Sequence, residues 1–211
     1  MNPLFYVLFY VTLNPLFQMK ENVKTLDGEY LFNKMEMSAG FLFKKDGTFL
    51  FYFSYGASDR NAKGTYTIIG DTLKLHSDKE PGNDFTIDQQ SKKNGPIEIH
   101  VKGPNKMLTS SARCICFHKD ERIDYEADQE GIIRPEATKC DKIFLKHQYY
   151  PDIPTLIKDE GNENNYFEVT LKQSLQQVSF KGIDFVIKEN TISCLPNYFM
   201  PFDHIVFTKS N

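Results

Sequence analysis

The sequence lacks tryptophan, an apolar run long enough to cross a bilayer, and any excess of basic residues. Its 211 residues include 25 Lys and Arg against 28 Asp and Glu, a net charge of −3. Residues 20–103 hold 12 basic and 12 acidic residues, and residues 104–211 hold 13 and 16. Contacts to phosphates and to anionic lipid surfaces need a basic excess. We therefore expect no nucleic-acid partner and no anionic membrane surface as a partner.

The longest apolar run lies in the first 19 residues, which carry no charge. It extends over ten residues from Leu4 to Leu13 and is interrupted only by Thr12. This length is typical of the core of a signal peptide and is too short for a transmembrane span. We expect residues 1–19 to be an export signal and the protein to be periplasmic, secreted or at the cell surface. The alternative is a buried first strand or helix.

Cysteine is sparse, with four residues at positions 114, 116, 140 and 194. An even number is compatible with an oxidising compartment but does not require one. A disulfide from Cys114 or Cys116 to Cys140 or Cys194 is one possibility, and its pairing stays open. The other is that these are small buried side chains.

Helical periodicity is also absent, whereas aromatic residues are abundant, with 18 Phe and 11 Tyr. No segment of eleven or more residues repeats every 3.6 residues; the nearest case is a short stretch from Ile153 to Glu160, which predicts at most one helical turn. Aromatic and β-branched residues favour strands. The composition therefore predicts an all-β protein.

The stretch FLFKKDGTFLFYFSY, residues 41–55, predicts a β-hairpin with one aromatic face. A three-residue loop that ends at Gly47 pairs Phe43 with Phe49 and Phe41 with Phe51. This register gathers the aromatic residues on one face, whereas a two-residue loop scatters them over both. The residues expected on that face are Phe41, Phe43, Phe49, Phe51, Phe53 and Tyr55.

A second hairpin is predicted over residues 63–76, around Gly70-Asp71. Glycine at the first turn position is typical of a type II′ turn, which pairs Ile68 with Leu73 and Tyr66 with Leu75. The alternation leaves one face wet and indicates an antiparallel sheet. Further strands are predicted at 84–88, 96–101, 112–118, 142–146, 165–171, 183–188 and 204–208.

Two polar stretches, 91–96 and 102–106, predict a domain boundary near residues 102–106. We expect an antiparallel half over residues 20–103 and a sandwich-like half over residues 104–211. The strands within 183–208 either stay with the second half or return to complete the first sheet.

The sequence patterns FxFxxDGTFxFxF at 41–53 and GTYTIIGDTLKL at 64–75 resemble those of the lipocalin-like β-domains of exported bacterial proteins. The resemblance covers about residues 27–76. It implies an antiparallel lipocalin-like barrel or sheet and an envelope location, and it implies no catalytic residue.

The region 112–171 resembles a carboxypeptidase-regulatory-like (transthyretin-like) module. The resemblance is carried by ARCICFH at 112–118, the turn at 128–131, KIFLK at 142–146 and NYFEVTL at 165–171. It implies a small Greek-key β-sandwich that acts as a spacer or docking domain without chemistry of its own.

A zinc site at Cys114, Cys116 and His118 is tempting, since these residues share one face of a strand. Same-face neighbours on a strand lie ~6.6 Å apart. Two thiolates on one zinc ion need sulfurs roughly 3.7 Å apart, given a Zn–S bond of about 2.3 Å. We therefore expect no metal here.

The acidic stretch at 124–131 resembles the first half of a calcium loop when it is counted from Glu126. The twelfth position, which should be a bidentate Glu, is Ala137. We interpret the stretch as a solvated turn between strands, with Gly131 supplying a positive φ.

The five histidines, at 76, 100, 118, 147 and 204, are scattered, and no nucleophile, phosphate or dinucleotide motif is present. We therefore expect a non-enzyme without a cofactor. The leading hypothesis is a non-catalytic binding or structural protein of the cell envelope, with a protein, a glycan or a small apolar ligand as partner. The alternatives are a lipocalin-type carrier, in which the aromatic face lines a cavity, and a metal-dependent hydrolase. An aromatic face of this kind more often belongs to a close-packed core than to the wall of a cavity.

Overall fold

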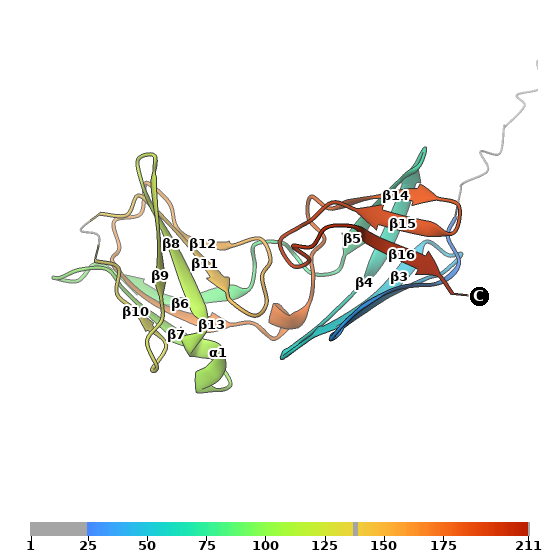
Figure 1. The fold of residues 1–211 in the computed structure, drawn as a ribbon. Coiled ribbons are helices and arrows are strands. Elements are labelled where there is room, and N and C mark those ends of the chain that lie inside the picture. The colour runs from blue at the N-terminus through green and yellow to red at the C-terminus, as the bar shows by residue number, and fades with distance from the viewer. Residues whose placement is uncertain (1–24, 137–138, 211) are drawn as a thin grey trace, which may run out of the picture.

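The computed structural model describes residues 25–136 and 139–210, so the predicted export signal lies outside the described residues. The fold is all-β, as predicted. A closed antiparallel barrel of eight strands lies beside a second body of two further sheets (Figure 1). Within the described ranges no helix is long and apolar enough to cross a membrane.

The barrel is built from both ends of the chain. Its strands are β1 (Gly28–Lys34), β2 (Met37–Phe43), β3 (Thr48–Tyr55), β4 (Ser58–Ile69), β5 (Thr72–Ser77), β14 (Asp184–Lys188), β15 (Thr191–Cys194) and β16 (Ile205–Lys209). The barrel closes where β16 pairs with β1, and the strand order around it is β1-β16-β15-β14-β5-β4-β3-β2. This is the architecture expected of a lipocalin-like fold.

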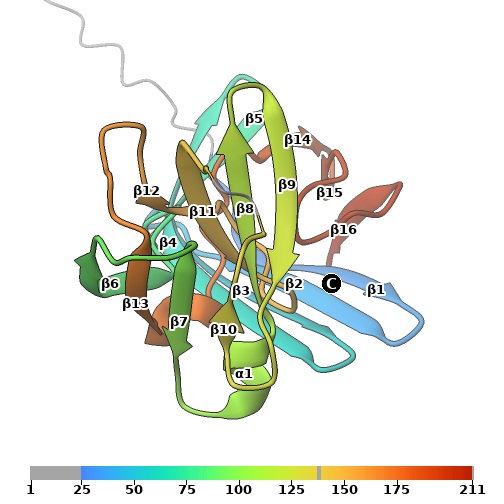
Figure 2. The same ribbon diagram turned by 90° about the vertical axis from the view of Figure 1, so that its left-hand side faces the viewer.

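The second body is inserted between β5 and β14. One sheet holds β6 (Phe85–Ser91), β7 (Glu98–Lys102), β10 (Ile132–Ile133) and β13 (Tyr166–Leu171); the other holds β8 (Ala112–His118), β9 (Glu121–Glu126), β11 (Lys142–His147) and β12 (Thr155–Lys158). The two sheets share one apolar core and form a sandwich (Figure 2). A short helix, α1 (Lys106–Ser110), and a 3₁₀ turn, η1 (Gln173–Gln176), complete it.

The observed strand pairing differs from the expected boundary near residues 102–106. Strands β6 and β7 fall in the expected first half, yet both pair with β13 in the sandwich, β7 in parallel. The polar stretches at 91–96 and 102–106 are therefore turns inside the sandwich. Local composition could not show this, because the pairing partner of both strands lies more than 60 residues further along the chain.

Both predicted hairpin registers are confirmed. Phe43 pairs with Phe49 and Phe41 with Phe51, while Ile68 pairs with Leu73 and Tyr66 with Leu75. The turn glycines Gly47 and Gly70 have positive φ values of 83° and 61°, which glycine adopts at no steric cost. Gly64 is required for another reason, since a Cβ there would lie 2.0 Å from the carbonyl oxygen of His76 on β5.

Two local predictions were wrong. Residues 155–158 form strand β12 and not a helical turn. Thr155 and Ile157 are buried while Leu156 is 46% exposed, so the stretch alternates like a strand and pairs with β11. The acidic stretch is a turn only after Glu126, because its first part is strand β9, which pairs with β8.

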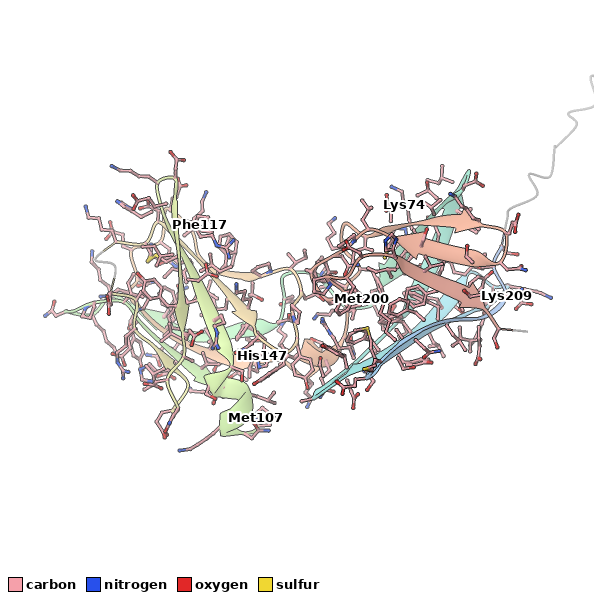
Figure 3. All side chains as sticks on the ribbon, viewed as in Figure 1. Lys74, Met107, Phe117, His147, Met200 and Lys209 are labelled. Carbon is pink, nitrogen blue, oxygen red and sulfur yellow. A yellow bond between two sulfur atoms is a disulfide. The ribbon has the colours of Figure 1, made fainter. Side chains whose placement is uncertain are left out.

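The barrel interior is filled by aromatic rings. The ring of Phe41 lies 4.6–6.2 Å, between centroids, from six others, those of Phe43, Phe49, Phe51, Phe180, Phe185 and Phe207. Phe180 enters from the segment before β14 with φ of +54°, which is unusual for a bulky residue. Its contacts with rings on three strands hold it there. Figure 3 shows side chains throughout both bodies.

The sandwich contains a disulfide between Cys116 on β8 and Cys140, which precedes β11. Cys114 and Cys194 are free thiols, and burial raises the pKa of each to about 12. Neither thiol is therefore ionised at neutral pH, and a thiol needs to be ionised to react as a nucleophile.

We predict that replacing both Cys116 and Cys140 with alanine lowers the free energy of unfolding by about 3 kcal/mol, because the crosslink closes a loop of 24 residues. Cys114→Ala, in the same core, is the control and should cost less. Urea unfolding with and without reductant measures the difference. Equal urea midpoints for the parent chain and the double variant, together with four titratable thiols in the unfolded parent chain, would contradict the pairing.

Candidate functional site

Most of the predicted aromatic face is buried in the barrel core. Phe41, Phe43, Phe49, Phe51 and Phe53 are each at most 4% exposed and belong to the barrel core. Tyr55 differs from them, because it lies at the end of β3 and is 45% exposed. Its ring stands edge-on to Phe202, with centroids 6.0 Å apart. The aromatic stripe therefore runs out of the barrel interior and ends at its rim.

A cleft of about 650 Å³ begins at this rim, between the barrel and the sandwich. We call it the junction cleft. Its aromatic lining comes from three separate places, namely the end of β3, the turn after β11 and the loop between β15 and β16: Phe53, Tyr55, Tyr149, Tyr198, Phe199 and Phe202. Its other lining residues include Glu36, Ser58, Arg60, Gln148 and Pro151.

Local hydrogen bonds position these rings. Ser58 Oγ donates to the carbonyl oxygen of Tyr149 at 2.8 Å, which joins the start of β4 to the sandwich turn. In the β15–β16 loop, the side-chain oxygen of Asn197 accepts bonds from the backbone N–H groups of Phe199 and Met200. This is the local turn geometry that asparagine favours, and it directs Phe199 toward the barrel.

A buried group of four charged side chains, of which Arg60 lines the cleft, joins the two bodies. We call it the junction cluster: Arg60, Lys79, Asp84 and Asp152. Arg60 lies on β4, Lys79 and Asp84 on the strand connection into the sandwich, and Asp152 in the sandwich turn after β11. The four are 3–7% exposed.

Asp152 is the centre of the junction cluster. Its carboxylate accepts bonds from the backbone N–H groups of Ile153 and Ser179 and from Ser179 Oγ. Oδ2 lies 3.3 Å from Lys79 Nζ and 3.6 Å from an Arg60 guanidinium nitrogen. Buried charges persist only when they are paired and hydrogen-bonded, and Asp152 meets both conditions.

The two cations have further partners. Lys79 Nζ lies 2.7 Å from Asp84 Oδ1 and donates to the carbonyl oxygen of Gln177. Arg60 donates to the carbonyl oxygens of Pro151 and Gln177. Burial lowers the pKa of Arg60 and raises that of Asp84, and the opposite charges around each oppose these shifts. With each side chain in its usual ionised form, the cluster holds two positive and two negative groups and is neutral as a whole.

His147, the last residue of β11, supports the turn that carries Tyr149. It is 1% exposed. Its Nε2 lies 3.0 Å from the carbonyl oxygen of Leu108, and its Nδ1 accepts the backbone N–H of Tyr149. These contacts require a neutral ring with the proton on Nε2. Burial lowers the pKa of His147 to about 4, helped by the nearby positive charges of Arg113 and Arg60.

We predict a pH-dependent stability from His147. Its pKa is lower in the folded chain than in the unfolded chain, where it is about 6.5. The contribution of the neutral ring is therefore complete above about pH 6.5 and is lost as the pH falls toward 4. The free energy of unfolding should drop by about 2 kcal/mol between pH 7.5 and pH 5.

Urea unfolding at the two pH values measures this drop. His147→Gln should remove most of it, whereas His76→Gln, at an exposed position on β5, should leave it in place. Asp124, whose pKa is lowered to about 2 by Arg122 and Lys146, acts only at lower pH. An unchanged drop in His147→Gln would show that this ring is not the titrating group.

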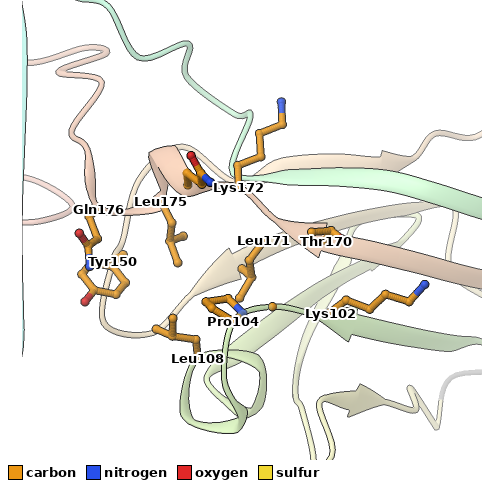
Figure 4. Close-up of a pocket in the computed structure, with 11 residues that line it drawn as sticks. Lys102, Pro104, Leu108, Tyr150, Thr170, Leu171, Lys172, Leu175 and Gln176 are labelled. Atoms are coloured by element: carbon orange, nitrogen blue, oxygen red, sulfur yellow. The ribbon is translucent and has the colours of Figure 1, made fainter.

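A second hollow lies on the sandwich, between the turn after β7 and η1 (Figure 4). Its volume is about 520 Å³, and its apolar lining includes Leu108, Tyr150, Leu171 and Leu175. The last three are at most 7% exposed and belong to the sandwich core. The lysines at its edge point away from the hollow in Figure 4 and are paired elsewhere, Lys102 with Glu168 and Lys172 with Asn83. This hollow thus offers few free side chains to a ligand.

The residues considered for a metal have other partners. Cys116 is in the disulfide, Cys114 is buried in the sandwich core, and His118 Nδ1 lies 3.0 Å from Asp141. Asp124 pairs with Arg122 and Lys146. Asp128 accepts bonds from the backbone N–H groups of Glu130 and Ile132, and Gly131 has the positive φ expected of this turn.

Most residues of the junction cleft were missed by sequence reasoning. The one available signal was composition: LPNYFMPF, residues 195–202, is rich in aromatic and apolar residues although it lies between two strands, where loops are usually polar. Tyr149-Tyr150-Pro151 gives the same signal after β11. No protein-family model, curated protein or solved structure matches this chain.

Proposed function

We propose that this is a non-catalytic binding protein and that the junction cleft is its ligand site. One observation carries the proposal: rings from three distant segments meet, partly exposed, in a single concave site. Ligand sites are concave, mostly apolar and provided with a few polar groups, and the cleft has these features. Tyr55 and Tyr149 are 45% and 42% exposed, so a ligand that covers them would bury substantial aromatic surface.

The filled barrel interior favours a ligand site in the junction cleft over a ligand site inside the barrel, as a carrier would have. The rings of Phe41, Phe49 and Phe180 lie within contact distance of one another at the centre of the barrel. An apolar ligand would have to displace them, at the cost of a close-packed core. The junction cleft needs no such rearrangement.

We also propose that the protein is exported and acts in the periplasm or at the cell surface, as the lipocalin-like resemblance implies. The Cys116–Cys140 disulfide supports this, because such bonds persist in oxidising compartments. The uncharged residues 1–19 would be its signal. On this view the sandwich is a carboxypeptidase-regulatory-like module that completes one wall of the cleft, and the partner is an envelope protein, a glycan or a small apolar ligand.

Nuclear magnetic resonance titration of the labelled chain tests the site. The probes are neutral hexasaccharides, dodecanol and decaproline, one for each class of partner. We expect one class to shift the signals of Tyr55, Tyr149 and Phe202 while those of Phe41 and Phe49 stay in place. Shifts confined to the barrel interior would favour the carrier, and the absence of shifts with all probes would contradict the proposed site.

A further inference from the structure

We propose that the ligand of the junction cleft is a neutral oligosaccharide. This inference rests on the proposed function and names the chemical class of ligand. A pyranose ring has an apolar face of C–H groups and a belt of hydroxyls around its edge. It therefore suits a site in which partly exposed aromatic faces are bordered by hydrogen-bonding groups.

The geometry of the rings fits such a ligand. Tyr55 and Phe202 stand at 82° to each other and form an aromatic corner at the barrel rim. Tyr149 borders the cleft from the sandwich, at the point where Ser58 is bonded to its carbonyl oxygen. A sugar unit stacked on one ring would meet the edge of another, and the open shape of the cleft lets a chain of such units continue into solvent.

The polar groups of the cleft are of the kind that bind hydroxyls. The side-chain oxygen of Gln148 accepts a bond from Arg113, which leaves its amide N–H₂ group as a donor. The phenol groups of Tyr55 and Tyr149 can donate or accept, and Glu36 adds a carboxylate acceptor at the edge. Each of these is a hydrogen-bonding group on the lining of the cleft.

The charges of the site disfavour an anionic ligand. Arg60 is the only cation among the described residues that line the cleft, and its charge is balanced within the junction cluster by Asp152. Lys34 Nζ lies at the rim, 5.6 Å from the ring centroid of Phe202, and donates to the carbonyl oxygen of Asp203. Lys79, next to it, is balanced by Asp84. A ligand carboxylate or phosphate would have to replace these buried partners, and the acidic Glu36 lies at the edge. The pairing of the buried charges therefore favours a neutral ligand.

The fold also disfavours an extended peptide that binds as an added strand. Such peptides pair with an exposed sheet edge. The barrel strands that border the cleft, β3 and β4, have neighbours on both sides in a closed barrel. A purely apolar ligand is disfavoured for another reason, since it would leave much of its surface in water and the polar lining groups without partners.

Isothermal titration calorimetry of the full chain, together with the resonance titration above, tests the inference. The neutral probes are cellohexaose, laminarihexaose, maltohexaose, xylohexaose and mannohexaose, and hexagalacturonate is the anionic probe. We expect at least one neutral probe to bind with a dissociation constant of about 1 mM or tighter. Tyr55→Ala and Tyr149→Ala should each weaken binding at least about tenfold, because truncated aromatic anchors carry losses of this size.

Tyr52→Ala is the matched control. Tyr52 lies three residues before Tyr55 and is 47% exposed, but it is not part of the cleft lining. Its loss should change binding by less than about twofold. If dodecanol, decaproline or hexagalacturonate shifts the cleft signals and no neutral sugar does, the saccharide inference fails while the site stands. The inference also fails if sugar binding is unchanged in both tyrosine variants. If no probe shifts the resonance signals of the cleft, both the inference and the proposed function are contradicted.

Discussion

Asp152→Ala is expected to lower the free energy of unfolding by about 3–5 kcal/mol, which is the usual cost of removing one partner from a buried ion pair. The carboxylate neutralises Arg60 and Lys79 and accepts three further hydrogen bonds. Without it, two cations share the single remaining carboxylate of Asp84. The loss measures the cost of these unpaired cations rather than the net contribution of the pair, because a buried pair must also overcome the desolvation of both groups.

The control for this prediction is an exposed pair in the same molecule. Lys63 and Asp78 lie 3.8 Å apart with side chains 69% and 60% exposed. Such pairs contribute little to stability, so Asp78→Ala should leave the urea midpoint close to that of the parent chain. If Asp152→Ala behaves like Asp78→Ala, the junction cluster does not hold the barrel and the sandwich together.

Phe41→Ala is the second substitution with a large expected effect. We expect a loss of about 3–5 kcal/mol, or a fall in melting temperature of roughly 6–20 °C. Phe41 is 1% exposed and its ring contacts six others, so its removal leaves a cavity that the surrounding rings cannot easily close. If the ring instead bordered an existing cavity, its removal would cost much less.

Leu50→Ala provides the comparison. Leu50 lies on β3 with its side chain on the opposite face, 44% exposed. Its truncation should cost far less than that of Phe41. Thermal unfolding of the two variants and the parent chain distinguishes a packed aromatic core from rings that border a cavity. Equal and small losses would mean that the aromatic face is not a packed core.

The hairpins could be predicted to the residue because pattern and turn chemistry agree there. Only one register of residues 41–55 places the phenylalanines on a common face, and Gly47 and Gly70 supply the positive φ values that the turns require. Burial on one face fixes the register of a strand strongly. The sequence therefore sufficed for the β2–β3 and β4–β5 hairpins within residues 41–55 and 63–76, while the first residues of β2 and β4 were not predicted.

The course of the chain between β5 and β14 could not be predicted in the same way. The pairing of β7 with β13 joins segments far apart in the sequence. The pairing of β16 with β1 also joins distant segments, and it follows one of the two alternatives given above, the return of strands within 183–208 to the first sheet. Short strands such as β12 and β15 hold too few residues for their alternation to stand out. Their structure is decided by the neighbours with which they pair.

The junction cluster and the cleft escaped prediction for the same reason. Lys79, Asp84 and Asp152 are residue types that normally lie on the surface, and nothing in their local sequence indicates burial. They become buried because the inserted sandwich brings Asp152 against β4 and against the two segments that connect the barrel with the sandwich, one after β5 and one before β14. The cleft rings share this origin, since three separate segments supply them.

The central claim is that the chain's own rings fill the barrel and so leave the junction cleft as the ligand site. A crystal structure of the protein under xenon pressure tests this claim most directly. Xenon enters dry apolar cavities in proteins. We predict no xenon atom inside the barrel. A xenon atom among Phe41, Phe49 and Phe180 would show that the interior is a cavity and would contradict the assignment of the ligand site to the junction cleft.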